Sequence, residues 1–280
     1  MKRSVTIFLL FLAFFLNSAN GEQGEPSEVL IGNELRDIAM DDEYVWIATE
    51  KGVNRYDRNL GKWKFFTIAN GLVSNLVNCI APERVEGILA KKSGREVWFG
   101  TDSGISVFDK ETNSWKSYTT KDGLIYNRVN CISVRGDDVW IGTDKGVSVY
   151  DKKKDKWMSY SSLPGIPTSK VTAIYHEYAY AWIGTQKGLA RYNYKERKWE
   201  HFRTRGSEWF SPEGGVRRTS DSPIPDDRIN AIDGEGRYVY IATKSCLVEF
   251  DRKATLNFVA ERTAYSGLKR SKRIAVNSLY

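Results

Sequence analysis

The stretch DVWIGTDKGVSVYD, residues 138–151, decides the fold of this chain. It reads as two short strands joined by a tight turn at 144–146, in which Gly146 is free to adopt a positive φ. A further strand carrying Trp157 begins a few residues later. The same text recurs along the chain, so that copies of its core occupy residues 45–49, 97–101, 139–143, 181–185 and 239–243. The chain is therefore an array of repeats.

Each copy belongs to a unit of four short strands, and these units predict a β-propeller. Trp140 and Trp182 each lie 42 positions after the corresponding tryptophan of the preceding unit. A repeat of this length is typical of propeller blades, which bury their faces by stacking against one another. We predict an all-β fold of five four-stranded blades over residues 35–260, with inner strands that begin near Leu35, Val77, Val129, Val171 and Ile229. Six blades is the alternative, because the tail at 261–280 resembles the start of another blade.

Two sets of tryptophans and two insertions modify the repeats. We expect the tryptophans of the second strands to fill the gaps between blades; they are Trp46, Trp98, Trp140 and Trp182. We expect the tryptophans of the fourth strands to cover the outer rim; they are Trp63, Trp115, Trp157 and Trp199. Insertions fall within 82–95 and 203–227. In the last unit Cys246 replaces the turn glycine, so this turn should change type or carry strain.

The N-terminus carries the pattern of a secretory signal. Residues 1–21 combine a basic start, an apolar run and a small-residue cleavage site, and residues 22–34 read as a lead-in. No second apolar run follows, so we predict a periplasmic or extracellular protein without a transmembrane segment after signal removal. The formal net charge is +7, which we interpret as solvated hairpin tips rather than a nucleic-acid surface.

The three cysteines do not indicate a metal site. Cys79 and Cys131 share one position of the repeat with Ala173 and Ala231, which indicates a small buried position. We interpret both as core thiols, with a disulfide between them as the alternative. No cysteine and histidine cluster has the spacing of metal ligands, and we expect neither metal nor cofactor.

The repeat resembles a known family. The pattern Trp-Ile-Gly-Thr-x-x-Gly, then Val/Leu-x-x-Tyr-Asp/Asn, Asp-Gly-Leu and Val-Asn-x-Ile, is similar to the two-component regulator propeller repeat over roughly residues 35–259. The resemblance implies a sensor-type propeller, which in that family commonly forms the extracytoplasmic part of hybrid histidine kinases, often in glycan sensing. Neither a kinase nor a transmembrane helix follows the repeats here, so it implies a stand-alone propeller.

The sequence offers little catalytic chemistry. His176 and His201 fall at positions expected for rim or hairpin residues, and the inner strands carry only Asp37 and Asp233 as acids. Glycoside hydrolysis needs two carboxyl groups at a set separation, and the spacing singles out no such pair. We therefore predict a non-catalytic module that binds an unknown ligand, either a glycan or a partner protein. The alternatives are a carbohydrate-active hydrolase or lyase of five-bladed type, and a structural surface module.

The candidate binding site lies at the mouth of the central channel. Loops that lead into the inner strands gather on one face of a propeller, and the 203–227 insertion is the longest of them. Aligned asparagines at the start of inner strands either line this mouth or hydrogen-bond a neighbouring blade. The predicted ligand-binding residues are Asn78, Asn130, Asn230, Tyr126, Trp209, Phe210, Arg205 and Arg217.

Overall fold

The computed structural model describes residues 30–86, 91–161, 170–177, 179–203, 206–210, 216–219, 224, 227–235, 238–251, 258–261 and 273–275. The predicted signal peptide at 1–21 and residues 22–29 of the lead-in lie outside these ranges. In the described part of the chain, no helix has the length and apolar character needed to cross a bilayer.

Antiparallel strands follow one another in five meanders, one for each repeat. The first three blades are β1 (Leu35–Met40), β2 (Tyr44–Thr49), β3 (Gly52–Asp57) and β4 (Lys62–Phe66); β5 (Val77–Glu86), β6 (Lys91–Thr101), β7 (Gly104–Asp109) and β8 (Ser114–Tyr118); and β9 (Val129–Arg135), β10 (Asp138–Thr143), β11 (Gly146–Asp151) and β12 (Lys156–Tyr160). The last two contain β13 (Val171–His176), β14 (Tyr180–Thr185), β15 (Gly188–Asn193) and β16 (Lys198–Arg203); and β19 (Ile229–Glu235), β20 (Tyr238–Thr243), β21 (Leu247–Asp251) and β22 (Phe258–Glu261). The predicted all-β propeller and its five inner-strand starts are confirmed.

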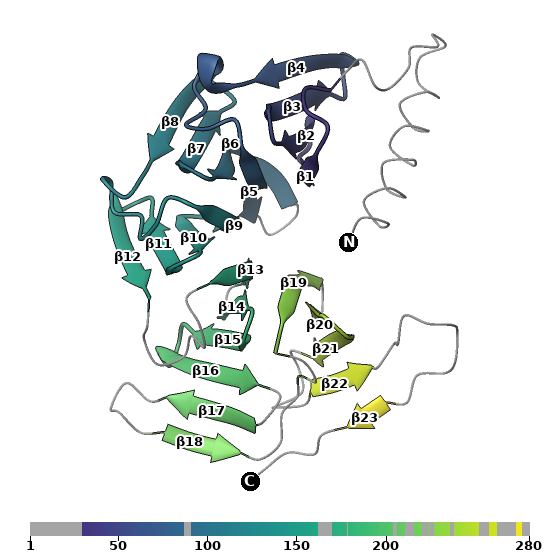
Figure 1. The fold of residues 1–280 in the computed structure, drawn as a ribbon, viewed down its shortest axis with the longest axis vertical. Coiled ribbons are helices and arrows are strands. Elements are labelled where there is room, and N and C mark those ends of the chain that lie inside the picture. Colours follow the sequence, from purple (N-terminus) through teal and green to yellow (C-terminus); the bar gives the residue numbers. More distant parts are fainter. Residues whose placement is uncertain are drawn as a thin grey trace.

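The blades are arranged around a common centre, with their first strands innermost (Figure 1). Successive inner strands contact one another from β1 through β5, β9 and β13 to β19. A single parallel pairing between Arg84 and Arg135 joins the second and third blades into one eight-stranded sheet. Among the described residues, β1 and β19 make no extensive contact with each other. These two strands belong to the first and last blades, which form the two ends of the arc (Figure 1).

The longer insertion differs from its expected position. It contains β17 (Gly206–Phe210) and β18 (Val216–Thr219), which extend the sheet of the fourth blade outward beyond β16. The expectation of a loop at the channel mouth was therefore wrong for these residues. The physical reason is that β16 would otherwise present an edge of unpaired backbone groups, and a hairpin satisfies them.

The tail also pairs differently from its sequence resemblance. β23 (Arg273–Ala275) resembles an inner strand of a further blade, but it pairs antiparallel with β22 at the outer edge of the fifth sheet. This pairing satisfies the edge of β22, which would otherwise carry unpaired backbone groups.

The Gly-Thr-x-x-Gly text is explained by one turn that recurs between second and third strands. In the third blade, the Thr143 hydroxyl donates to the Gly146 carbonyl at 2.9 Å and accepts from the Lys145 N–H at 3.1 Å. Gly146 has φ +127°, and an added Cβ would lie 2.2 Å from the Tyr160 carbonyl oxygen. Only glycine fits this geometry without strain.

The fifth blade forms the corresponding turn without a glycine. Cys246 is not among the described residues with positive φ, and β21 begins only at Leu247. Thr243 still donates its hydroxyl to the Cys246 carbonyl at 3.0 Å. Of the two outcomes expected for this turn, the change of type is therefore the one observed.

Tryptophan-centred clusters hold neighbouring blades together, as predicted. Trp46, Trp98, Trp140 and Trp182 are at most 2% exposed, and each packs against apolar residues of the next blade. Trp115 of the outer set contacts Phe66 of the preceding blade at a ring-centroid distance of 5.4 Å. Gly142 lets the second strand approach Val171 of the next inner strand, because a Cβ there would lie 2.5 Å from the valine side chain.

Candidate functional site

One face of the propeller collects the polar positions of the repeats. Two positions of each repeat lie together here: the residue before the inner strand, and the turn between the second and third strands. Backbone hydrogen bonds join them, from the Asp102 N–H to the Leu76 carbonyl at 3.3 Å and from the Lys244 N–H to the Arg228 carbonyl at 3.0 Å. We call this surface the entry face. Its defining residues are Glu34, Leu76, Arg128, Lys170 and Arg228, which precede inner strands, and Glu50, Asp102, Asp144, Gln186 and Lys244, which open the turns.

The aligned asparagines at the start of inner strands join adjacent blades. The Asn78 Nδ2 donates to the Val129 carbonyl of the next blade at 2.9 Å, and the Asn130 Nδ2 donates to the Val171 carbonyl at 3.0 Å. Thr172 repeats the contact with a hydroxyl, which donates to the Ile229 carbonyl at 2.7 Å. Of the two roles left open by the sequence, the structure shows the bond to a neighbouring blade.

Asn230 occupies the same position in the fifth blade but bonds within its own blade. Its Nδ2 donates to the Thr243 carbonyl at 3.2 Å. At the other end of the array, the Arg36 Nη1 donates to the Asn78 Oδ1 at 2.7 Å. The second residue of the inner strand is therefore polar in every blade, but the group to which its side chain bonds differs at the two ends of the arc.

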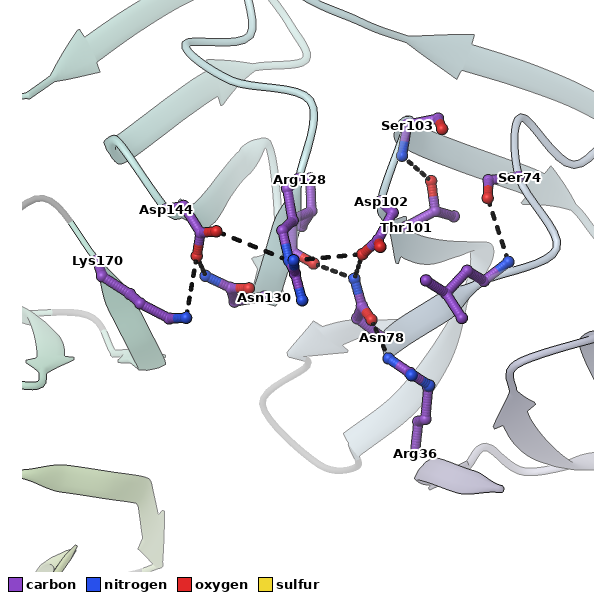
Figure 2. A network of polar contacts seen from close by, with 12 residues as sticks. Arg36, Ser74, Asn78, Thr101, Asp102, Ser103, Arg128, Asn130, Asp144 and Lys170 are labelled. Atoms are coloured by element: carbon purple, nitrogen blue, oxygen red, sulfur yellow. Dashed lines mark hydrogen bonds and ion pairs between the residues drawn. The ribbon is translucent and has the colours of Figure 1, made fainter. Parts of the chain in front are cut away.

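Carboxylates of the turns connect these amides to basic side chains (Figure 2). The Asn78 and Asn130 Nδ2 atoms also donate to the carboxylates of Asp102 at 2.7 Å and Asp144 at 2.9 Å. Arg128 lies between the two acids, with its Nε 3.6 Å from Asp102 Oδ1 and 3.7 Å from Asp144 Oδ2. Lys170 approaches Asp144 from the other side at 3.5 Å. Three blades thus contribute to one network of charges and amides.

The remaining predicted site residues fall in different places. Tyr126 lies in the loop before β9, and the Lys145 ammonium sits 4.6 Å from its ring centroid, so it belongs to the entry face. Trp209, Phe210 and Arg217 lie on β17 and β18, whose backbone runs beyond the outermost strand of the fourth blade, away from the inner-strand slots. Arg205 lies outside the described residues. The structure therefore brings Asn78, Asn130 and Tyr126 to one face and does not bring the hairpin aromatics to it.

The inner-strand acids and the histidines do not form a catalytic pair. Burial raises the pKa of Asp37 to about 6, and this carboxylate accepts the Ile80 N–H of the second blade at 2.8 Å. Asp233 is exposed on the fifth blade. His176 ends β13 beside a hairpin and His201 lies on β16, the strands expected from the sequence, and both side chains are buried, at 6% and 4% exposure. Burial lowers the pKa of His176 to about 3, which keeps it neutral at pH 7, and its Nδ1 lies 2.9 Å from the Ser133 hydroxyl.

The thiols are structural in character. Cys79, Cys131 and Cys246 are free, so the alternative of a disulfide between the first two is not observed. Burial raises the pKa of the Cys131 thiol to about 12 and raises that of Cys79 as well. Within the described ranges, no group of three or more His, Cys, Asp or Glu side chains could hold a metal ion.

Sequence reasoning missed the charged residues that carry the network. Asp102, Asp144, Arg128 and Lys170 were absent from the predicted site, although two repeat positions mark them. One position is the first residue of the turn between the second and third strands, and the other is the residue before the inner strand. The signal was available in the alignment of the repeats, because these two positions change charge from blade to blade while the threonine before the turn recurs in every blade.

Comparisons with known proteins show the same fold. The extracellular domain of the hybrid two-component system BT3049 from B. thetaiotaomicron is 18% identical, with a TM-score of 0.52 over 87% of this chain and 37% of that one. The corresponding domain of BT4673 from the same organism is 16% identical, with a TM-score of 0.50 over 86% of this chain and 38% of that one. The WD40 repeats of RRP9 are 12% identical, with a TM-score of 0.52 over 80% of this chain and 78% of that one.

These similarities confirm the propeller fold. The chain spans less than two-fifths of the length of these two extracellular domains. No family model matches the sequence, and no curated protein matches it either.

Proposed function

We propose that this protein is an exported, non-catalytic binding module that recognises its ligand at the entry face, in the manner of a sensor domain. The observation that supports this most directly is the network of Asp102, Arg128, Asp144 and Lys170, which three blades bring together. Arg128 and Lys170 keep 49% and 42% of their side chains exposed, so their charged groups remain accessible while their carboxylate partners orient them. Orientation before binding reduces the entropy lost when a ligand is captured.

The sensor-like role draws on the solved structures with this fold. The similar structures from B. thetaiotaomicron are extracellular domains of two-component systems, which supports a role in ligand detection outside the cytoplasm. A glycan or a partner protein is the ligand class that the resemblance favours. Export of this chain and the role of residues 1–21 as a signal belong to the same proposal.

The entry face is a poor site for glycoside hydrolysis. A general acid needs a carboxyl group in apolar surroundings that keep it protonated. Asp102 and Asp144 instead lie beside Arg128 and accept amide N–H groups from Asn78 and Asn130. Their carboxylate oxygens already serve as hydrogen-bond acceptors and ion-pair partners, which suits a binding role.

The test is a binding screen of the mature protein, followed by substitution at the entry face. Ligands that raise the unfolding temperature in a glycan and peptide library are measured by calorimetry against Arg128→Gln and Lys170→Gln, and we expect each to weaken binding by about two- to tenfold. The matched control is Lys153→Gln, an exposed lysine of the β11–β12 hairpin tip. Unchanged affinity in both entry-face variants would place the site elsewhere, and conversion of the ligand detected by mass spectrometry would contradict a non-catalytic role.

A further inference from the structure

Charge is divided unevenly around the entry face. Four positions of each repeat are compared: the residue before the inner strand, the second residue of that strand, and the two residues of the turn between the second and third strands. In the first three blades these positions carry equal numbers of acidic and basic residues, which are Glu34, Glu50, Asp102 and Asp144 against Arg36, Lys51, Arg128 and Lys145. The same positions of the fourth and fifth blades carry Lys170, Lys187, Arg228 and Lys244 and no acid. Among the described residues, Asp227 adds one negative charge beside Arg228. We call these four basic residues the cationic half.

The balanced part of the face pairs its charges internally. Arg36 lies 3.4 Å from Glu34, and Arg128 lies between Asp102 and Asp144. Lys170, at the border, shares Asp144 with Arg128. Glu34, Asp102 and Asp144 therefore already lie beside cations of the protein itself, whereas Glu50 accepts the Asn33 and Glu34 N–H groups.

The cationic half lacks these turn carboxylates. The turn position that holds Asp102 and Asp144 in earlier blades holds Gln186 in the fourth blade and Lys244 in the fifth. Gln186, Lys187, Arg228 and Lys244 are all exposed. The backbone bond from Lys244 to Arg228 fixes two basic residues next to each other. Like charges held together raise the local potential and attract anions, with a strength that falls as salt is added.

Neutral polar groups are interleaved with these cations. Asn230, Gln186 and Ser245 bring amides and a hydroxyl to the repeat positions between the basic residues. Amides and hydroxyls both donate and accept hydrogen bonds, which suits the hydroxyl groups of a sugar. This combination of cations with amides favours a carbohydrate that carries acidic groups.

We propose that the cationic half binds the carboxylates of an acidic oligosaccharide, one built from uronic acid units. The inference rests on the proposed function and names the ligand class of the same face. Lys244, Lys187 and Arg228 contact carboxylates, while Gln186 and Asn230 hydrogen-bond the sugar hydroxyls.

The experiment compares one oligosaccharide in two charge states. Calorimetry of the full chain is carried out with an oligogalacturonate and with the same oligogalacturonate after methyl esterification of its carboxylates. We expect the acidic form to bind at least about tenfold more tightly, and its affinity to fall as ionic strength rises. Lys187→Gln and Lys244→Gln should each weaken the acidic ligand by about two- to fivefold, the range expected for one exposed charge pair.

Controls separate this inference from the broader one. Lys51→Gln, in the corresponding turn of the balanced first blade, should leave the affinity for the acidic ligand unchanged. Equal affinity for the two forms, or binding of neither, overturns the acidic class, while a different ligand from the screen that depends on Arg128 leaves the proposed function standing. Equally tight, salt-sensitive binding of a single-stranded oligonucleotide or an acidic peptide would show a general anion surface and would also overturn it.

Discussion

Replacing Asp37 with asparagine should stabilise the protein at neutral pH. Burial raises the pKa of this carboxyl group from 3.8 to about 6, so the folded state holds the proton more tightly than the unfolded chain. The stability contributed by this group is therefore fully present below pH 3.8 and is lost as pH rises toward 6. A shift of about two pKa units corresponds to about 3 kcal/mol of lost stability at pH 7.

Asparagine removes the buried charge but also one acceptor. The Asp37 carboxylate accepts the Ile38 N–H at 2.9 Å and the Ile80 N–H at 2.8 Å, whereas asparagine offers a single oxygen. The loss of one hydrogen bond offsets about 1 kcal/mol. We therefore expect Asp37→Asn to raise the free energy of unfolding by about 2 kcal/mol at pH 7, and to change it little or lower it slightly at pH 4.

Urea denaturation at pH 4 and pH 7 measures this difference, because titrations common to both proteins cancel. Asp233→Asn is the matched control, since Asp233 is an exposed acid on another inner strand. The reasoning is refuted if Asp37→Asn has the same effect at both pH values, or if the control reproduces the pH dependence.

Three further substitutions test the repeat architecture by chemical denaturation. Trp140→Ala should destabilise by about 3–5 kcal/mol, because the side chain is 2% exposed between two blades; Leu60→Ala, at 69% exposure, should have little effect. Gly146→Ala should destabilise by about 1–3 kcal/mol or more, because of its positive φ and the nearby Tyr160 carbonyl, while Gly136→Ala has open space around it and isolates the φ contribution. Asn130→Ala should destabilise by about 1–2 kcal/mol more than Asn230→Ala, because only Asn130 bonds the next blade; equal losses would contradict its role between blades.

The fold could be predicted from sequence because its determinants repeat. The turn of Thr143 and Gly146 and the packing of Trp140 both need a particular residue at a fixed spacing, and three other units repeat all of these residues. The fifth unit keeps the threonine but has Tyr240 and Cys246 in place of the tryptophan and the glycine. Sequence spacing therefore reports directly on strand order and blade count. Insertions carry no such periodicity, which is why the pairing of β17 with β16 had to come from the structure.

The site was less predictable because one repeat position serves different chemistry in different blades. Asp37, Cys79 and Ala173 share a slot, and in the first blade the side chain reaches across to a backbone N–H of the second. Sequence alone identified the slot as small and buried, but not as a contact between blades. The same limit applied to Asn78 and Asn130, whose amides could face ligand or neighbour until their partners were known.

Specificity in this propeller should reside at positions that the fold leaves free. The Asn78 and Asn130 amides bond the next inner strand, so a ligand would have to compete with contacts between blades in order to use them. The residues before the inner strands and at the start of the turns contact one another through partly exposed side chains, as Arg128 does with Asp102 and Asp144. They do not set the turn, which depends on the neighbouring threonine and, in four of the blades, on a glycine. Their side chains range from Glu50 through Gln186 to Lys244 without any change in strand register. The charge of these residues can therefore differ from blade to blade around the entry face without any change in how the blades pack. This freedom is what allows one half of the face to be cationic.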